Sequence, residues 1–69
     1  MSSRLLPLAA MEKILKHSGA ERVSDKAKVA LKGVMEEIAD QIAAKAIRLA
    51  NHAGRTTVKD RYIKIAAKE

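Results

Sequence analysis

The sequence predicts an all-α fold, with two short helices flanking one long helix in a single domain over residues 1–69. Tyr62 is the only aromatic residue among the 69, so aliphatic side chains and Met must form the core, which favours helix packing over a β-sandwich. Apolar residues also recur at helical spacing along most of the chain. Gly19 and Gly54 interrupt that pattern and divide the chain into three segments.

The first helix is expected to be about ten residues long. Pro7 suits a first helical turn, and apolar residues then follow at helical spacing until Gly19 ends the pattern. These residues are Leu8, Met11, Ile14 and Leu15.

The second helix is expected to run from an N-cap at Ser24, with Asp25 in its first turn, to Ala53, about 29 residues in all. No proline interrupts it, and Gly54 stands where a left-handed residue usually ends a helix. Gly33 inside it costs about 1 kcal/mol relative to Ala, and the pattern offers no reason for it.

The third helix is expected to begin at a Thr57 cap, with Asp60 completing a capping box. Its predicted apolar side consists of Ile63, Ala66 and Ala67.

The length of the central helix predicts a dimer. At 1.5 Å per residue it would span roughly 43 Å, whereas a compact monomer of this size has a radius of gyration of about 11 Å. Two short helices would leave its centre uncovered, so we expect an antiparallel second copy related by a two-fold axis. The predicted dimer core is formed by Leu31, Val34, Met35, Ile38, Ile42 and Leu49.

Two similar segments, GAERVSD at 19–25 and GRTTVKD at 54–60, flank the long helix. An antiparallel pair would bring the first segment of one copy against the second segment of the other. Backbone N–H groups at helix starts, together with basic side chains, bind phosphate. The residues expected to contribute to this site are Arg22, Ser24, Arg55, Thr56, Thr57 and Lys59.

The net charge of +6 indicates a polyanionic partner. The basic surplus lies in the two flanking parts, while lysines of the long helix, such as Lys28 and Lys32, alternate with Glu36, Glu37 and Asp40 and are expected to form a solvated face. The chain has no cysteine, no Gly-rich phosphate loop and no metal-ligand spacing, so no enzyme, cofactor or metal site is expected. The apolar runs are too short for a membrane span, and the N-terminus does not resemble a secretory signal, which predicts a cytoplasmic protein.

Three segments resemble archaeal histones: GAERVSDKA, EEIADQIAAKAIRLANHAGR and the TTVK that follows. The similarity extends from about Leu6 to Ala67 without a gap. It implies the histone fold, in which two chains form an obligate handshake dimer. It also implies a chromosome-associated, non-enzymatic protein that wraps and compacts duplex DNA in nucleosome-like form.

The resemblance implies individual roles. The family's minor-groove arginine falls on Arg22, and the threonine that orients it across the dimer falls on Thr57. Basic positions near DNA fall on Lys13 and Lys59, and we expect Lys16 to contribute as well.

The sequence departs from the family at Thr56, where a basic residue is common, and at Tyr62, where an Asp usually holds the loop arginine, here Arg55. The implied contact between dimers falls on Leu49, His52 and Tyr62. An alternative function is a histone-fold interaction subunit of a transcription or regulatory complex. In the cell the partner chain would be a second copy or a paralogue.

Overall fold

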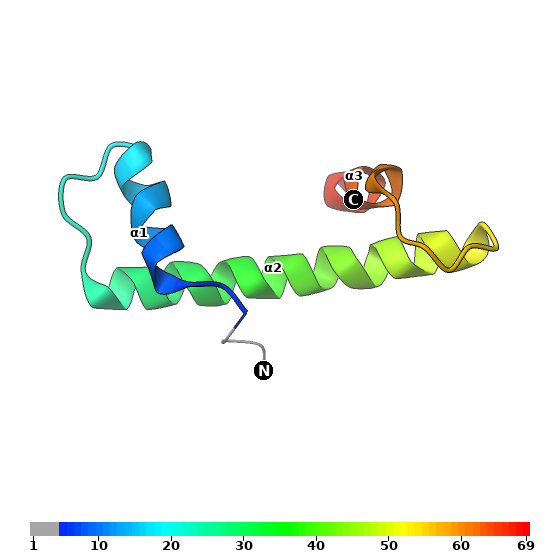
Figure 1. The fold of residues 1–69 in the computed structure, drawn as a ribbon, viewed down its shortest axis with the longest axis horizontal. Helices are drawn as coiled ribbons and strands as arrows, with labels where there is room; N and C mark the ends of the chain where they lie inside the picture. Colours follow the sequence, from blue (N-terminus) through cyan, green and yellow to red (C-terminus); the bar gives the residue numbers. More distant parts are fainter. Residues whose placement is uncertain (1–4) are drawn as a thin grey trace. The chain divides into compact units, whose positions relative to one another are not determined.

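The computed structural model describes residues 5–69 and contains three helices in this range (Figure 1). They are α1 (Leu8–His17), α2 (Asp25–His52) and α3 (Asp60–Lys68). The predicted order of short, long and short helices is therefore confirmed, and no strand occurs within residues 5–69.

The chain divides into two compact units, Met1–Glu37 and Ile38–Glu69. The helix α2 is continuous across this boundary, so each unit combines one short helix with part of the long one. That the chain is a single domain remains a prediction.

The helices α1 and α2 end in the same way. Gly19 and Gly54 both have positive φ, at 119° and 73°, as expected for a glycine just beyond a helix end. Behind Gly54, the Arg55 N–H donates to the carbonyl of Ala50 at 2.9 Å, and the Ala20 N–H makes the equivalent bond to Leu15 at 3.0 Å. These bonds satisfy carbonyls that the helix ladder leaves free, so both chain reversals are fixed locally.

The N-termini of α2 and α3, which follow these two turns, are capped differently. The Ser24 hydroxyl accepts a hydrogen bond from the Ala27 N–H at 3.0 Å, which confirms the predicted cap of α2. The predicted Thr57 cap of α3 is wrong: Lys59 is the N-cap and no side chain caps this helix. The reason is local, because the Lys59 carbonyl accepts the first bond of the helix, from the Tyr62 N–H at 3.0 Å.

In the first unit, α1 buries Met11, which is 1% exposed and is one of the four apolar residues predicted for this helix. Two of the others, Leu8 and Ile14, are 43% and 42% exposed. A second buried group is unexpected. Glu36 is 4% exposed, and its Oε2 accepts the N–H groups of Leu5 at 3.1 Å and Leu6 at 2.8 Å. Lys32 lies 3.6 Å from the same carboxylate and donates to the Leu6 carbonyl. The segment that leads into α1 is thus bound to α2.

This arrangement corrects the expectation of a solvated charged face on α2. The side chains of Lys28 and Lys32 are only 19% and 13% exposed. They lie under α1 because Glu12 and Glu36 offer them carboxylates there. Only part of that face, including Glu37 and Asp40, is exposed to solvent.

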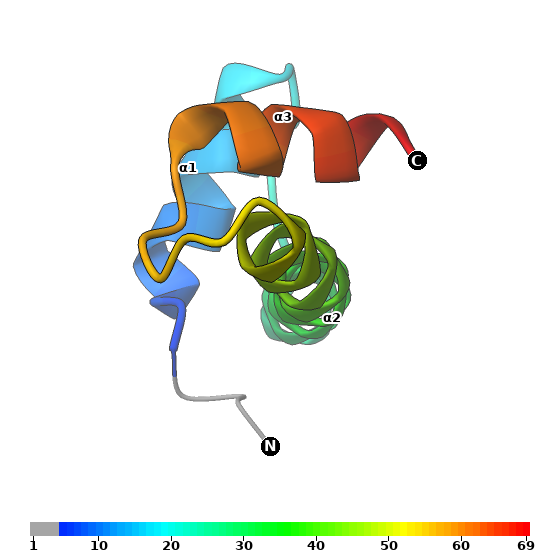
Figure 2. The same ribbon diagram turned by 90° about the vertical axis from the view of Figure 1, so that its right-hand side faces the viewer.

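In the second unit, α3 crosses the C-terminal part of α2 (Figures 1 and 2). The core consists of Tyr62 and Ala66 from α3 packed against Ala46 and Ala50, with Ile42 and Leu49 partly buried beside them. The predicted apolar side of α3 is therefore right only at Ala66. Ile63 is 41% exposed and Ala67 is exposed as well, because the large Tyr62 ring rotates the buried side of the helix by about one residue.

Neither short helix covers the apolar side chains in the middle of α2. Val34 is 52% exposed and Ile38 is 50% exposed, one helical turn apart. Gly33 has nothing within 4 Å of the position that a Cβ would occupy, so no contact inside the chain requires a glycine there.

The buried carboxylate leads to a stability prediction. Glu36→Ala should lower the free energy of unfolding by about 1 to 3 kcal/mol, because it leaves the N–H groups of Leu5 and Leu6 without their acceptor and removes the ion pair of Lys32. Glu36→Gln keeps one acceptor oxygen, so its free energy of unfolding should decrease less than that of Glu36→Ala. Urea unfolding at one fixed protein concentration measures both, with the exposed neighbour Glu37→Ala as control. Equal stability of the Glu36→Ala and Glu37→Ala variants would contradict the anchoring role.

Candidate nucleic-acid interface

The first unit presents three of the predicted DNA-binding side chains on its surface. Lys13, Lys16 and Arg22 are all exposed. Lys16 forms an ion pair with Glu12 at 3.2 Å, and together with Lys28 it holds the pKa of the Glu12 carboxyl below its usual value. Within residues 5–69, Lys13 and Arg22 form no ion pair. Their charges are therefore the more available of the three for a polyanion.

Arg22 and Ser24 both lie in the loop between α1 and α2, residues 18–24, which we call loop one. The Ser24 hydroxyl is used to cap α2, so a contact with DNA would be additional to that structural role. The N–H groups of the first turn of α2 lie beside it, at the positive end of the helix dipole.

The second unit carries the other four predicted residues in loop two, residues 53–59. Arg55, Thr56, Thr57 and Lys59 are all exposed. The backbone N–H of Arg55 is used in the helix end, but its side chain forms no ion pair with any residue from 5 to 69. Loop two thus presents two cations and two hydroxyl groups close together in the sequence.

Arg61, which the sequence analysis did not select, also belongs to this basic region. Its guanidinium lies 5.0 Å from the centroid of the Tyr62 ring, and its Nη2 donates a hydrogen bond to the Tyr62 hydroxyl at 3.1 Å. This bond, with the charges of Arg61, Arg55 and Lys59, lowers the pKa of the Tyr62 hydroxyl despite the burial of the ring. The signal in the sequence was an Arg–Tyr pair in the first turn of the helix that follows a basic loop.

The residues predicted to join two dimers are found in the second unit. Leu49 packs partly buried against the core that contains Tyr62, whereas His52 is exposed at the end of α2. Tyr62 is only 6% exposed and contributes mainly to the core of its own chain. A contact between dimers through these residues remains a prediction.

The predicted dimer core is incompletely covered in the single chain. Val34 and Ile38 are exposed, and the remaining four residues are only partly buried: Leu31, Met35, Ile42 and Leu49. Each of the six therefore retains apolar surface that a second chain could cover.

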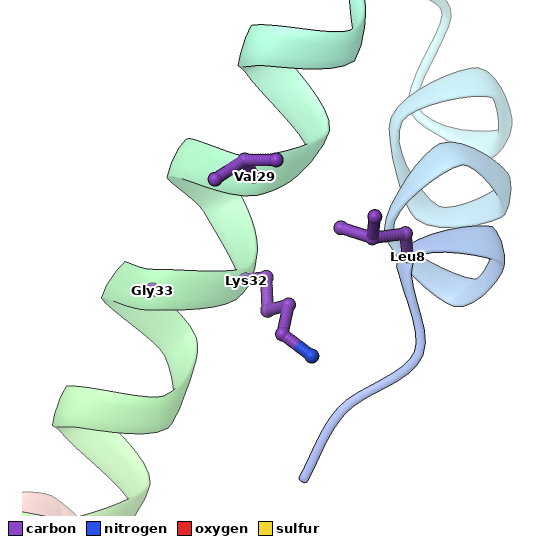
Figure 3. A pocket seen from close by; sticks show the side chains of 4 residues that line it. All are labelled: Leu8, Val29, Lys32 and Gly33. Carbon is purple, nitrogen blue, oxygen red and sulfur yellow. The ribbon is translucent and has the colours of Figure 1, made fainter. Parts of the chain in front are cut away.

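Two grooves lie in the first unit, one lined by Asp25, Lys26, Val29 and Ala30 and the other by Leu8, Val29, Lys32 and Gly33. Figure 3 shows one of them, where Leu8 of α1 faces Val29, Lys32 and Gly33 of α2. Among the described residues, 5–69, no group of three His, Cys, Asp or Glu side chains could hold a metal ion. No helix in that range is long and apolar enough to cross a membrane.

Comparisons with known proteins identify the family of this chain. The family model described as "Histone-like transcription factor (CBF/NF-Y) and archaeal histone" matches residues 4–67. The chain is 43% identical over 63 residues to one of the subunits of archaeal histone HAN1 from Thermococcus zilligii, covering 91% of this chain and 94% of that protein. It is 48% identical over 61 residues to probable archaeal histone 3 of Methanocaldococcus jannaschii, covering 88% and 91% of the two chains.

The contact between Arg61 and Tyr62 leads to a prediction about ionisation. Because Tyr62 is the only tyrosine, absorbance at alkaline pH reports this hydroxyl alone. Its midpoint should lie below the ordinary value of 10.0, since the neighbouring cations stabilise the phenolate. Arg61→Gln should raise the midpoint, and Lys64→Gln, one turn away, should leave it nearly unchanged. A wild-type midpoint at or above the ordinary value would refute the contact.

Proposed function

Because the chain belongs to the family of archaeal histones and histone-like transcription factors, we propose that two copies pair through their long helices and that the pair binds and wraps duplex DNA. The observation that most supports pairing is the uncovered apolar face at the middle of α2, around Val34 and Ile38. In water this surface is costly, at about 25 cal/mol per Å² of apolar area. A second copy of the same helix offers an identical apolar face.

An antiparallel arrangement about a two-fold axis near the middle of α2 follows from self-complementarity. Ile38 lies close to the midpoint of the helix, so the two copies of this side chain would meet near the axis. Ala39 and Ala43 are small and exposed, which permits close approach of the two helices.

The same arrangement would place loop one of one chain beside loop two of the other. Arg22 would then lie near Thr57, Arg55 and Lys59 of the partner subunit, at each end of the pair. Each end would combine guanidinium and ammonium groups with hydroxyl groups and the N-terminus of α2, all of which bind phosphate. Arg22 would enter a narrow minor groove.

The proposed contacts are mainly to the DNA backbone, so binding would depend little on base sequence and strongly on salt. Lys13 would add a phosphate contact from the outer face of α1, and Lys16 a weaker one because Glu12 shares its charge. Within residues 5–69, the grooves and the unpaired cations form no catalytic arrangement, so the proposed function is structural.

A different partner chain is the main alternative. One relative is named as part of a multi-subunit histone, and the family description includes transcription factors. A related chain with a similar apolar helix could replace the second copy. The molecular mass of the purified protein distinguishes the two, because a self-pairing chain needs no other component.

Pairing through the middle of α2 leads to the first functional prediction. Purified protein should have the mass of a dimer at micromolar concentration in analytical ultracentrifugation. Ile38→Lys should weaken the dimer at least tenfold, because two ammonium groups would meet near the axis. Ala44→Lys is the matched control, since it places the same side chain on the exposed face of Asp40 and Glu37. A folded wild-type monomer, or equal effects of the two variants, would refute this interface.

The proposed contact between loop one and DNA leads to the second functional prediction. Arg22→Ala should weaken binding to duplexes of different sequence by about the same factor, roughly tenfold, and should lower the slope of log K against log salt by about 0.9. Arg48→Ala, which removes a cation from the exposed surface of α2, should change the slope much less. A changed preference among sequences with unchanged average affinity would contradict recognition of the backbone.

A further inference from the structure

One cation, Arg61, contacts the Tyr62 hydroxyl at the start of α3, and the charges of two others act on it. Arg61 stacks on the ring at 5.0 Å and donates to the hydroxyl at 3.1 Å. Arg55 and Lys59 are close enough that their charges act on the same oxygen. Because the ring is buried in the core with Ala46 and Ala50, it forms a fixed support for the Arg61 guanidinium.

No carboxylate of residues 5–69 lies within ion-pair distance of these cations, although the pKa of Arg61 is raised by its hydrogen bond to Tyr62 and, to a smaller extent, by the charge of Asp60. Within residues 5–69, Arg55, Lys59 and Arg61 form no ion pair. Asp60, the acidic residue between them in the sequence, lies 3.6 Å from Lys64. The three charges therefore repel one another, and an anion bound among them would relieve that repulsion.

The geometry suits a phosphate group in particular. A guanidinium presents several N–H donors in a plane and can bind two phosphate oxygens at once. Stacking on a buried ring restricts the rotamers of Arg61 in advance, which lowers the entropy lost on binding. Tyr62 acts here as a positioning residue, because its ring and hydroxyl hold the guanidinium in place. All four residues belong to one chain, so the site does not require the partner subunit.

We propose that Arg61, held on Tyr62 and flanked by Arg55 and Lys59, forms a phosphate site for duplex DNA next to the paired loops. The inference rests on the proposed function. It extends that function by adding a contact from α3 itself. The DNA backbone is favoured over an acidic peptide because its phosphates are regularly spaced, so that one duplex can contact this site as well as the basic loop residues.

The test compares Arg61→Gln with Lys64→Gln. Both variants remove one positive charge from α3, but Lys64 is paired with Asp60 and is 75% exposed. Binding to a duplex of mixed sequence is measured across a salt series. Arg61→Gln should lower the salt slope by about 0.9 and weaken binding roughly three- to tenfold, and Lys64→Gln should have less than half of either effect. Thermal unfolding followed by circular dichroism checks that both variants fold.

A second measurement follows Tyr62 directly. As the only tyrosine, it gives a single set of phenol ring signals in NMR spectra. Addition of the duplex to the wild type should shift these signals, and the shift should shrink in Arg61→Gln. Tyr62→Phe keeps the ring but removes the acceptor of the Arg61 hydrogen bond, so it should give a smaller loss of slope than Arg61→Gln.

The outcomes separate this inference from the proposed function. If the wild type binds duplex DNA and Arg22→Ala weakens it, but Arg61→Gln and Lys64→Gln behave alike, the α3 site is refuted and the proposed function stands. If the wild type binds no duplex, both fail. If Arg61→Gln abolishes binding to polyglutamate while leaving DNA binding intact, the ligand is an acidic peptide and the proposal is wrong.

Discussion

The unequal lengths of the helices constrain the rest of the structure. The helix α2 has 28 residues, whereas α1 has ten and α3 has nine, so each short helix can cover only part of its apolar surface. In the first unit Met11 is buried, in the second unit Tyr62 packs against Ala46 and Ala50, and Val34 and Ile38 in the middle of α2 remain exposed. Full burial of one large aliphatic side chain contributes about 1.5 to 3 kcal/mol. In the proposed pair, the side chains of the dimer core would thus contribute an amount comparable with the whole stability of a small domain. Folding and pairing would then be closely coupled.

The two loops show how local structure prepares the binding surface. Each helix end before a loop has a glycine with positive φ and the same pair of backbone hydrogen bonds. Measured from that glycine, both following helices begin at the same distance, at Asp25 and Asp60. The two similar sequence segments, 19–25 and 54–60, therefore form turns of equal length. Because each turn is fixed by its own backbone, the basic side chains it carries do not depend on distant contacts for their position.

Much of the fold could be predicted from the sequence because helix ends are encoded locally. Glycines stop α1 and α2, and Ser24 starts α2, each through residues within one turn. The incorrect predictions concern which side chains are buried. Burial depends on residues that are distant in the sequence, or it is decided between residues that have the same helical spacing. Glu36 is buried because it meets the N–H groups of Leu5 and Leu6, about thirty residues earlier, and no periodicity reveals such a partner. On α3, Tyr62 and Ala66 compete with Ile63 and Ala67 at the same spacing, and only packing against α2 selects the buried pair.

The candidate site was only partly predictable for a related reason, because the sequence gives the number of charges but not their pairing. Lys28 and Lys32 could have been candidates for a polyanion, yet they are largely buried and bound to carboxylates of their own chain. Arg61 looked like one more surface cation, yet it is held on an aromatic ring in a region with little acidic compensation. A cation that is already paired gains little from a new anion, since it must first give up its partner. A cation that is unpaired and already oriented avoids both that loss and the full cost of ordering its side chain. The arrangement of charges, more than the net charge of +6, therefore decides which surface a nucleic acid would bind.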